Sequence, residues 1–135
     1  MKKILIISAL LTSTLAIAQP QYKVEKLPSG VEITHVFNGE GIYPLENSKV
    51  EVNYEGKLLD GTIFDSSYKR GMPISFRLDR VIPCWAEGVQ KMKVGGKAFL
   101  TCPAETAYGK KGVPGVIPPD ATLKFQVELL SVIKQ

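Results

Sequence analysis

The chain has 135 residues, enough for one globular domain, and 44% of them are hydrophobic, an ordinary fraction for a folded protein. Seventeen Lys and Arg against thirteen Asp and Glu give a formal net charge of +4 at pH 7. This excess does not indicate a nucleic-acid partner, because the lysines are interspersed with Gly and Val and lack a stacking platform for bases. We interpret them as a solvated surface: Lys91, Lys93, Lys97, Lys110 and Lys111.

The first eighteen residues have the pattern of an export signal. Two lysines precede an apolar run from Ile4 to Leu15, and residues 16–18 form the small-x-small pattern of signal peptidase cleavage. An uncleaved membrane anchor is the alternative, but the apolar run is shorter than the ~20 residues that span a bilayer. We predict that 1–18 is a cleaved signal peptide, which lowers the net charge to +2 and leaves a mature chain with no membrane attachment. The periplasm fits such a chain best, with full secretion as the alternative.

Residues 19–30 form a short lead-in, and we expect one domain over 31–135. The lead-in is too short to be a separate dimerisation domain, so we predict a monomer. Segment 31–37 alternates apolar and polar residues and precedes turn residues, which indicates a strand and a bend. His35, the only histidine, lies in this strand and is interpreted as an ordinary strand or surface residue.

The next segments also alternate. Residues 50–55 predict a strand with one face in water. Asp60-Gly61 is a hairpin dipeptide that leads to residues 62–67, where we expect a strand that ends in turn-forming residues. A further short strand is expected over 73–78.

One helix is expected to begin near Pro83, because proline suits the first helical turn. Trp85, Val89 and Met92 recur at helical spacing until Gly95-Gly96, which predicts about three turns. Two alternating strands follow, with these residues on their apolar faces: Ala98, Leu100 and Cys102, then Leu123, Phe125, Val127 and Leu129. The order predicts an α+β fold in which a mostly antiparallel sheet covers one short helix.

Cys84 and Cys102 lie in a chain bound for an oxidising compartment, where an even number of cysteines favours pairing. A metal site would need further ligands, and a nucleophilic thiol would need an activating base; His35 lies in an early strand. We therefore expect a disulfide, no metal site and no cofactor. Whether the two sulfurs meet depends on the folded geometry.

The Gly- and Pro-rich segment 107–119 is longer than the usual connection, which indicates a binding element, and its apolar residues suggest an apolar ligand. The chain has no nucleophile elbow, Walker loop or Cys-x-x-Cys motif. Asp60 and Asp65 suggest the acid pair of a glycosidase, but Asp60 belongs to the turn dipeptide, which makes hydrolysis a weak candidate.

Five motifs resemble, in their order, those of the FKBP-type peptidyl-prolyl cis/trans isomerases. They are Tyr54-Glu55-Gly56, Asp60-Gly61-x-x-Phe64-Asp65-Ser66-Ser67, Val81-Ile82-Pro83-x-Trp85-x-Glu87-Gly88, Ala107-Tyr108-Gly109, and Ile117-Pro118-Pro119 through Phe125-x-Val127-Glu128-Leu129-Leu130. The resemblance covers about residues 28–134. It implies a half-barrel of antiparallel strands wrapped on one helix, and an isomerase that needs no cofactor.

The resemblance also implies roles for individual residues. Trp85 floors a proline pocket, Tyr108 binds a substrate carbonyl from the rim, and the N–H of Ile82 binds another. The residues predicted to be catalytic are Tyr54, Phe64, Asp65, Trp85, Tyr108 and Phe125. Those predicted to bind substrate are Ile74, Phe76, Val81, Ile82, Val113, Val116 and Ile117. Ile74 and Val113 depart from the family pattern, where an aromatic residue and a histidine are frequent.

The partners that the resemblance implies are proline-containing polypeptides and the macrolide inhibitors of the family. Rotation about an Xaa-Pro bond faces a barrier of roughly 18–20 kcal/mol, and an apolar pocket that favours the twisted amide lowers it without a nucleophile. The first hypothesis is an exported prolyl isomerase that assists protein folding. The alternative is a non-catalytic chaperone or binding module that uses the same pocket.

Overall fold

The computed structural model describes residues 21–133, so the predicted signal peptide at 1–18 lies outside the described residues. The strands are β1 (Lys23–Lys26), β2 (Glu32–Phe37), β3 (Lys49–Leu58), β4 (Ile63–Ser66), β5 (Ile74–Arg77), β6 (Lys97–Cys102) and β7 (Leu123–Ile133). They form one antiparallel sheet in the order β1-β2-β6-β7-β3-β4, and β5 also pairs with β3. The described helices are α1 (Ser67–Arg70) and α2 (Pro83–Val89), with 3₁₀ turns at Leu78–Arg80 and Ala104–Thr106.

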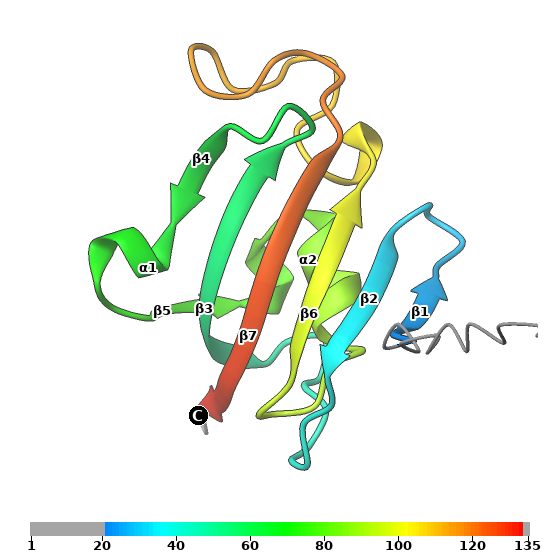
Figure 1. Cartoon of the computed structure of the whole chain (residues 1–135), viewed down its shortest axis with the longest axis vertical. Helices are drawn as coiled ribbons and strands as arrows, with labels where there is room; N and C mark the ends of the chain where they lie inside the picture. The colour runs from blue at the N-terminus through cyan, green and yellow to red at the C-terminus, as the bar shows by residue number, and fades with distance from the viewer. Residues whose placement is uncertain (1–20, 134–135) are drawn as a thin grey trace, which may run out of the picture.

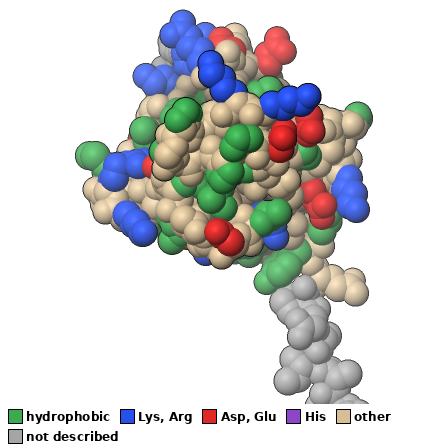
Figure 2. Space-filling view, turned by 90° about the horizontal axis from the view of Figure 1, so that it is seen from above, with side chains coloured by type: hydrophobic (Ala, Val, Ile, Leu, Met, Phe, Trp, Pro, Cys, Tyr) green, Lys and Arg blue, Asp and Glu red, His purple; other side chains and the backbone are tan. Residues whose placement is uncertain are grey.

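The sheet curves around α2 and does not close into a barrel (Figure 1). This arrangement confirms the predicted α+β half-barrel. The end that carries the 107–119 loop has apolar side chains near its centre and charged side chains around its margin (Figure 2). Within residues 21–133, no helix has the length and apolar character needed to cross a membrane.

The hydrophobic core lies between the sheet and α2. The alternation of β3, β6 and β7 turns one face of each strand inward, and the apolar residues predicted for those faces are all buried. Leu78, in the 3₁₀ turn before α2, is completely buried, as is Val89 at the end of the helix. Gly88 lets α2 approach β6 closely, because a Cβ there would lie 2.9 Å from Leu100 Cδ2.

Helix α2 is shorter than the spacing of its apolar residues predicts. It has seven residues, about two turns, and ends at Val89 rather than near Gly95. The predicted third turn is wrong: the N–H groups of Lys91 and Met92 donate to carbonyls three residues back, those of Gly88 and Val89, and the Val94 N–H donates to the Ile42 carbonyl. Met92 is still buried, but it reaches the core from a turn.

Two elements have no counterpart among the predicted ones. Strand β1 lies in the segment 19–30 and pairs antiparallel with β2, with Val24 opposite Thr34. Its residues are mostly exposed, so it lacks the apolar alternation that marks a strand. Helix α1 is a single turn, capped by the Ser66 side chain at its start and by Gly71 in the left-handed conformation at its end.

The structure confirms the disulfide between Cys84 and Cys102. Cys84 lies in the first turn of α2 and Cys102 ends β6, with their Cα atoms 5.6 Å apart. Both residues are completely buried. The bond therefore joins the start of the helix to the sheet from inside the core.

We predict that replacing both cysteines by alanine lowers the free energy of unfolding by about 3 kcal/mol, because the bond closes a loop across a sequence separation of 18 residues. Urea unfolding followed by Trp85 fluorescence measures the change. Wild-type protein reduced before unfolding is the control and should match the variant. Equal stability of the oxidised protein and the variant would show that the bond adds nothing to the fold.

Candidate functional site

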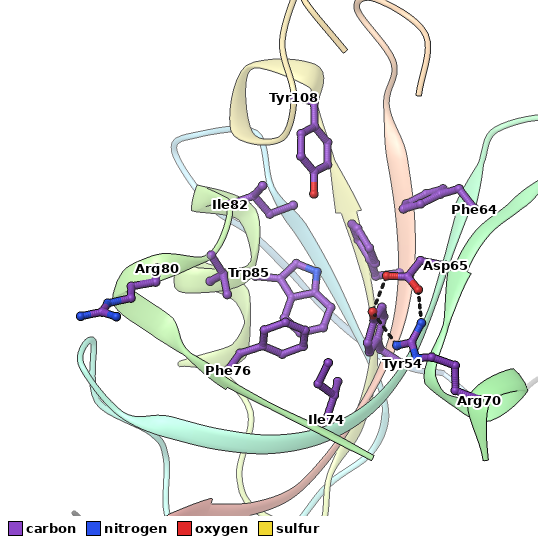
Figure 3. Close-up of a pocket in the computed structure, with 12 residues that line it drawn as sticks. Tyr54, Phe64, Asp65, Arg70, Ile74, Phe76, Arg80, Ile82, Trp85 and Tyr108 are labelled. Atoms are coloured by element: carbon purple, nitrogen blue, oxygen red, sulfur yellow. Dashed lines mark hydrogen bonds and ion pairs between the residues drawn. The ribbon is translucent and has the colours of Figure 1, made fainter. Parts of the chain in front are cut away.

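A cavity of about 680 Å³ opens between α2 and the half of the sheet that contains β3, β4 and β5. Its lining comes from four strands, helices α1 and α2, the 3₁₀ turn at Leu78–Arg80 and the connections between them, so residues far apart in the sequence meet there (Figure 3). The lining residues are Tyr54, Phe64, Asp65, Arg70, Ile74, Phe76, Arg80, Val81, Ile82, Trp85, Tyr108 and Phe125. The structure thus brings together all six residues predicted as catalytic and four of the seven predicted to bind substrate.

Trp85 lies at the centre of an aromatic cluster. Its ring packs edge-on against three others, with centroid separations of 5.1 Å to Tyr54, 5.4 Å to Phe76 and 5.4 Å to Phe125. Such contacts stabilise by about 0.5–1.5 kcal/mol each beyond the burial of apolar area. Trp85 is itself buried, so the indole is held on several sides while it still lines the cavity.

Gly56 in β3 allows two rings to lie over the strand. Phe64 and Phe125 pack edge-to-face with centroids 5.6 Å apart. A Cβ on Gly56 would lie 2.5 Å from Phe64 Cζ and 2.8 Å from Phe125 Cε1, closer than side chains approach. The glycine of the Tyr54-Glu55-Gly56 motif is therefore required by the shape of the cavity wall.

A polar triad of Tyr54, Asp65 and Arg70 lies on the side of the cavity that faces Ile82 and Arg80 (Figure 3). The Tyr54 hydroxyl and the Arg70 guanidinium both donate to the Asp65 carboxylate, and Arg70 Nη2 also donates to the Tyr54 hydroxyl oxygen at 3.1 Å. The guanidinium carbon lies 5.8 Å from the centroid of the Tyr54 ring. The three side chains thus fix one another in a closed set of hydrogen bonds.

The triad shifts the pKa values of its members. Burial raises the pKa of the Asp65 carboxyl, but the hydrogen bonds from Tyr54 and Arg70 and the charge of Arg70 outweigh it, so the net shift is downward. Burial and the hydrogen bond to Asp65 raise the pKa of the Tyr54 hydroxyl. Asp65 therefore stays ionised and Tyr54 stays protonated at neutral pH.

Helix α1 delivers Arg70 to the triad. Ser66 caps its start by accepting a hydrogen bond from Lys69 N–H, and the single turn brings Arg70 back beside Asp65. Ser67, fully buried, accepts from Tyr54 N–H at 2.8 Å and ties the helix to β3. Arg70 is missing from the residues predicted from the sequence. The sequence signal that could have found it is a capping serine, Ser66, followed five residues later by Gly71, with basic residues between them.

Tyr108 reaches the cavity from the 107–119 loop and is 40% exposed, as expected of a rim residue. The loop is fixed at its base, because Gly109 N–H donates to the Ala104 carbonyl and Asp120 N–H to the Gly109 carbonyl. The loop thus presents Tyr108 from a hydrogen-bonded base.

Three predicted substrate-binding residues of the loop do not line the cavity. Val113 and Ile117 form a β-bridge with each other, and Ile117 is buried in the core. Val116 is 48% exposed. Contact of these three residues with substrate stays a prediction. Arg80 lines the cavity although the sequence patterns did not indicate it.

A family model described as FKBP-type peptidyl-prolyl cis-trans isomerase matches residues 41–130. The chain belongs to this family, as the motifs indicated. It is 53% identical over 109 residues to the FKBP-type peptidyl-prolyl cis-trans isomerase FkpA of Escherichia coli, a match that covers 81% of this chain and 40% of that protein. It is 51% identical over 104 residues to FK506-binding protein 1 of Dictyostelium discoideum, covering 76% of this chain and 97% of that one.

Solved structures agree with these matches. The crystal structure of FkpA from Escherichia coli superposes with a TM-score of 0.78 at 52% identity, and the match covers 81% of this chain and 51% of that one. The crystal structure of AtFKBP13 gives a TM-score of 0.75 at 33% identity, covering 82% and 99%. The chain thus spans less than half the length of the curated FkpA protein. The matches to FK506-binding protein 1 and AtFKBP13 instead cover nearly the full length of those two proteins.

We predict that Arg70→Gln raises the pKa of the Asp65 carboxyl, because the variant loses a charge and a hydrogen bond that hold the pKa down. A carbon-detected NMR titration of the Asp65 side chain measures it. Since the folded-state pKa of Asp65 lies below its ordinary value, the triad stabilises the fold above that ordinary value, and the stabilisation is lost as pH falls through the folded-state pKa. In Arg70→Gln this stabilisation is smaller, and its loss is complete at a higher pH.

Arg77→Gln is the matched control, because Arg77 also forms an ion pair with an aspartate, Asp79, and lies outside the cavity. It should raise the pKa of Asp79 and leave that of Asp65 unchanged. An Asp65 pKa equal in wild type and Arg70→Gln would contradict the triad.

Proposed function

We propose that this protein catalyses cis/trans rotation of Xaa-Pro bonds in polypeptides and so assists protein folding. The observation that carries the proposal is the aromatic cavity of about 680 Å³ around Trp85, in a chain whose family is that of the FKBP-type isomerases. The substrates are proline-containing polypeptides in unfolded or partly folded states, and macrolides of the kind that bind the family compete for the cavity. X-Pro isomerisation takes tens to hundreds of seconds uncatalysed, slow enough to limit folding.

The mechanism rests on differential binding of the twisted amide. A planar amide is resonance-stabilised and polar, and rotation removes the resonance and part of the polarity. A cavity that replaces water with aromatic rings destabilises the planar form relative to the twisted one. Lowering the barrier by ~4 kcal/mol accelerates rotation about a thousandfold. Trp85 supplies the floor for the proline ring, and Phe64, Phe76 and Phe125 supply walls.

Hydrogen-bond donors around the rim orient the substrate backbone. Ile82 precedes α2, and its carbonyl accepts from Trp85 N–H at 2.9 Å and Ala86 N–H at 3.1 Å. These bonds fix the peptide plane that follows Ile82. Within residues 21–133 the Ile82 N–H donates to no acceptor, which leaves it free to bind a substrate carbonyl. The Tyr108 hydroxyl binds a second carbonyl, and Asp65 faces the rotating amide from the triad.

We further propose that the domain acts outside the cytoplasm, in the periplasm, after removal of residues 1–18. The pattern of the first eighteen residues supports export. The buried disulfide between Cys84 and Cys102 supports it independently, because such bonds persist in oxidising compartments.

We predict that the protein accelerates isomerisation of an Ala-Leu-Pro-Phe peptide in a protease-coupled assay, and that Asp65→Asn lowers kcat/KM about tenfold, because the variant weakens hydrogen bonds to a charged group. Asp60→Asn is the matched control, since Asp60 lies in the β3–β4 turn outside the cavity. It should keep wild-type activity.

If micromolar protein did not accelerate isomerisation of this peptide, the proposed enzyme activity would be refuted. If the same preparation still bound the peptide, as seen in Trp85 fluorescence, the cavity would belong to a binding module or chaperone instead.

A further inference from the structure

The rim of the cavity carries one cation that the fold does not neutralise. The charged residues of the lining are Asp65, Arg70 and Arg80. Asp65 and Arg70 form an ion pair within the triad. Arg80 is exposed, and its guanidinium forms no hydrogen bond or ion pair with any of the residues 21–133. The cavity therefore has a net positive charge, located at Arg80.

The acid nearest to Arg80 in the sequence is already engaged. Asp79 accepts from Arg77 Nε at 3.0 Å and from Arg77 Nη2 at 2.8 Å, a two-bond pairing that uses both carboxylate oxygens. This pairing lowers the pKa of Asp79, to which Arg80 adds a smaller effect through its charge. Asp79 thus stays ionised and bound to Arg77, which leaves the Arg80 guanidinium available to an outside anion.

The backbone around Arg80 is fixed next to the substrate site. Arg80 ends the 3₁₀ turn that begins at Leu78, whose side chain is completely buried and whose N–H donates to the Ser48 carbonyl at 2.9 Å. Only Val81 separates Arg80 from Ile82. Figure 3 places Arg80 across the aromatic cluster from Arg70, with its side chain extending outward from the rim. A peptide bound in the cavity would pass within reach of this long side chain.

We infer that Arg80 gives the protein a preference for substrates with an acidic residue next to the proline. The inference rests on the proposed isomerase function and names a class of substrate for the same cavity. A carboxylate a few ångströms from an exposed guanidinium gains a modest attraction, and a lysine at the same place is repelled. The effect therefore adjusts the choice among Xaa-Pro sequences, and rotation of a neutral peptide does not depend on it.

The test compares isomerisation of two peptide series by NMR exchange, which needs no coupling protease. One series is Ala-Xaa-Pro-Phe and the other Ala-Leu-Pro-Xaa, with Xaa as Glu, Gln or Lys. We expect wild type to show a ratio of kcat/KM for Glu over Lys of about threefold to tenfold in at least one series at low salt. Arg80→Glu should invert that ratio, and Arg80→Gln should bring it near one.

Lys124→Glu is the matched control, because it makes the same charge change on an exposed residue of β7 that does not line the cavity. It should keep the wild-type ratio. Raising the salt should shrink the ratio in wild type, as expected for exposed charges. Ala-Leu-Pro-Phe, the neutral peptide, reports the isomerase itself, and its kcat/KM in each protein is the reference against which the Glu and Lys values of that protein are compared.

The outcomes separate the two proposals. Acceleration of the neutral peptide with equal Glu and Lys rates in wild type and Arg80→Glu would overturn the preference and leave the isomerase intact. A ratio that changes as much in Lys124→Glu as in Arg80→Glu would also overturn it, because the effect would then come from net charge. No acceleration of any peptide would instead refute the proposed function.

Discussion

The rest of the site depends on how Trp85 is held. The indole belongs to a helix of only two turns, which would be marginal by itself, and its position comes from its surroundings. Three aromatic rings from the sheet pack edge-on against it, and the neighbouring Cys84 is bonded to the end of β6. Because the rings come from β3, β5 and β7, the floor of the cavity and its walls are one packed unit.

The triad places a charged carboxylate beside this apolar unit, and that charge is paired within the triad. Asp65 would be costly in an aromatic cavity, but Tyr54 and Arg70 both donate to it. The same tyrosine packs against Trp85, so the triad and the aromatic cluster share a residue. Disturbing the ion pair therefore alters the position of a ring, which couples the electrostatics of the rim to the shape of the floor. Arg80 also lines the cavity but makes no bond to the triad, so its charge can bias substrate choice without disturbing the hydrogen bonds of Asp65.

Most of the fold and of the site could be predicted from the sequence, because long elements leave periodic signals. The alternation in β3 and β7 predicted the buried faces correctly, and the spaced motifs indicated the six residues that meet at the cavity. Very short elements, and elements that form only through contacts with distant parts of the chain, left no periodic signal. A single turn such as α1 has no periodicity, so Arg70 was not predicted. Strand β1 forms because it pairs with β2, and its own residues carry no apolar alternation. Helix α2 ends early because the chain after Val89 forms tight turns and then donates to distant carbonyls, those of Ile42 and Leu129, which the apolar spacing does not reveal.

If the cavity accelerates rotation without proton transfer, the pH dependence of kcat/KM for a neutral Xaa-Pro peptide is the most direct test. Asp65 has a lowered pKa and Tyr54 a raised one, and His35 lies in β2, separated from β3 by β6 and β7. The profile should therefore be flat from about pH 6 to about pH 9, with a solvent deuterium isotope effect near one. A bell-shaped profile, or an isotope effect of about two or more, would show that a proton moves in the rate-limiting step and would contradict catalysis by the apolar cavity.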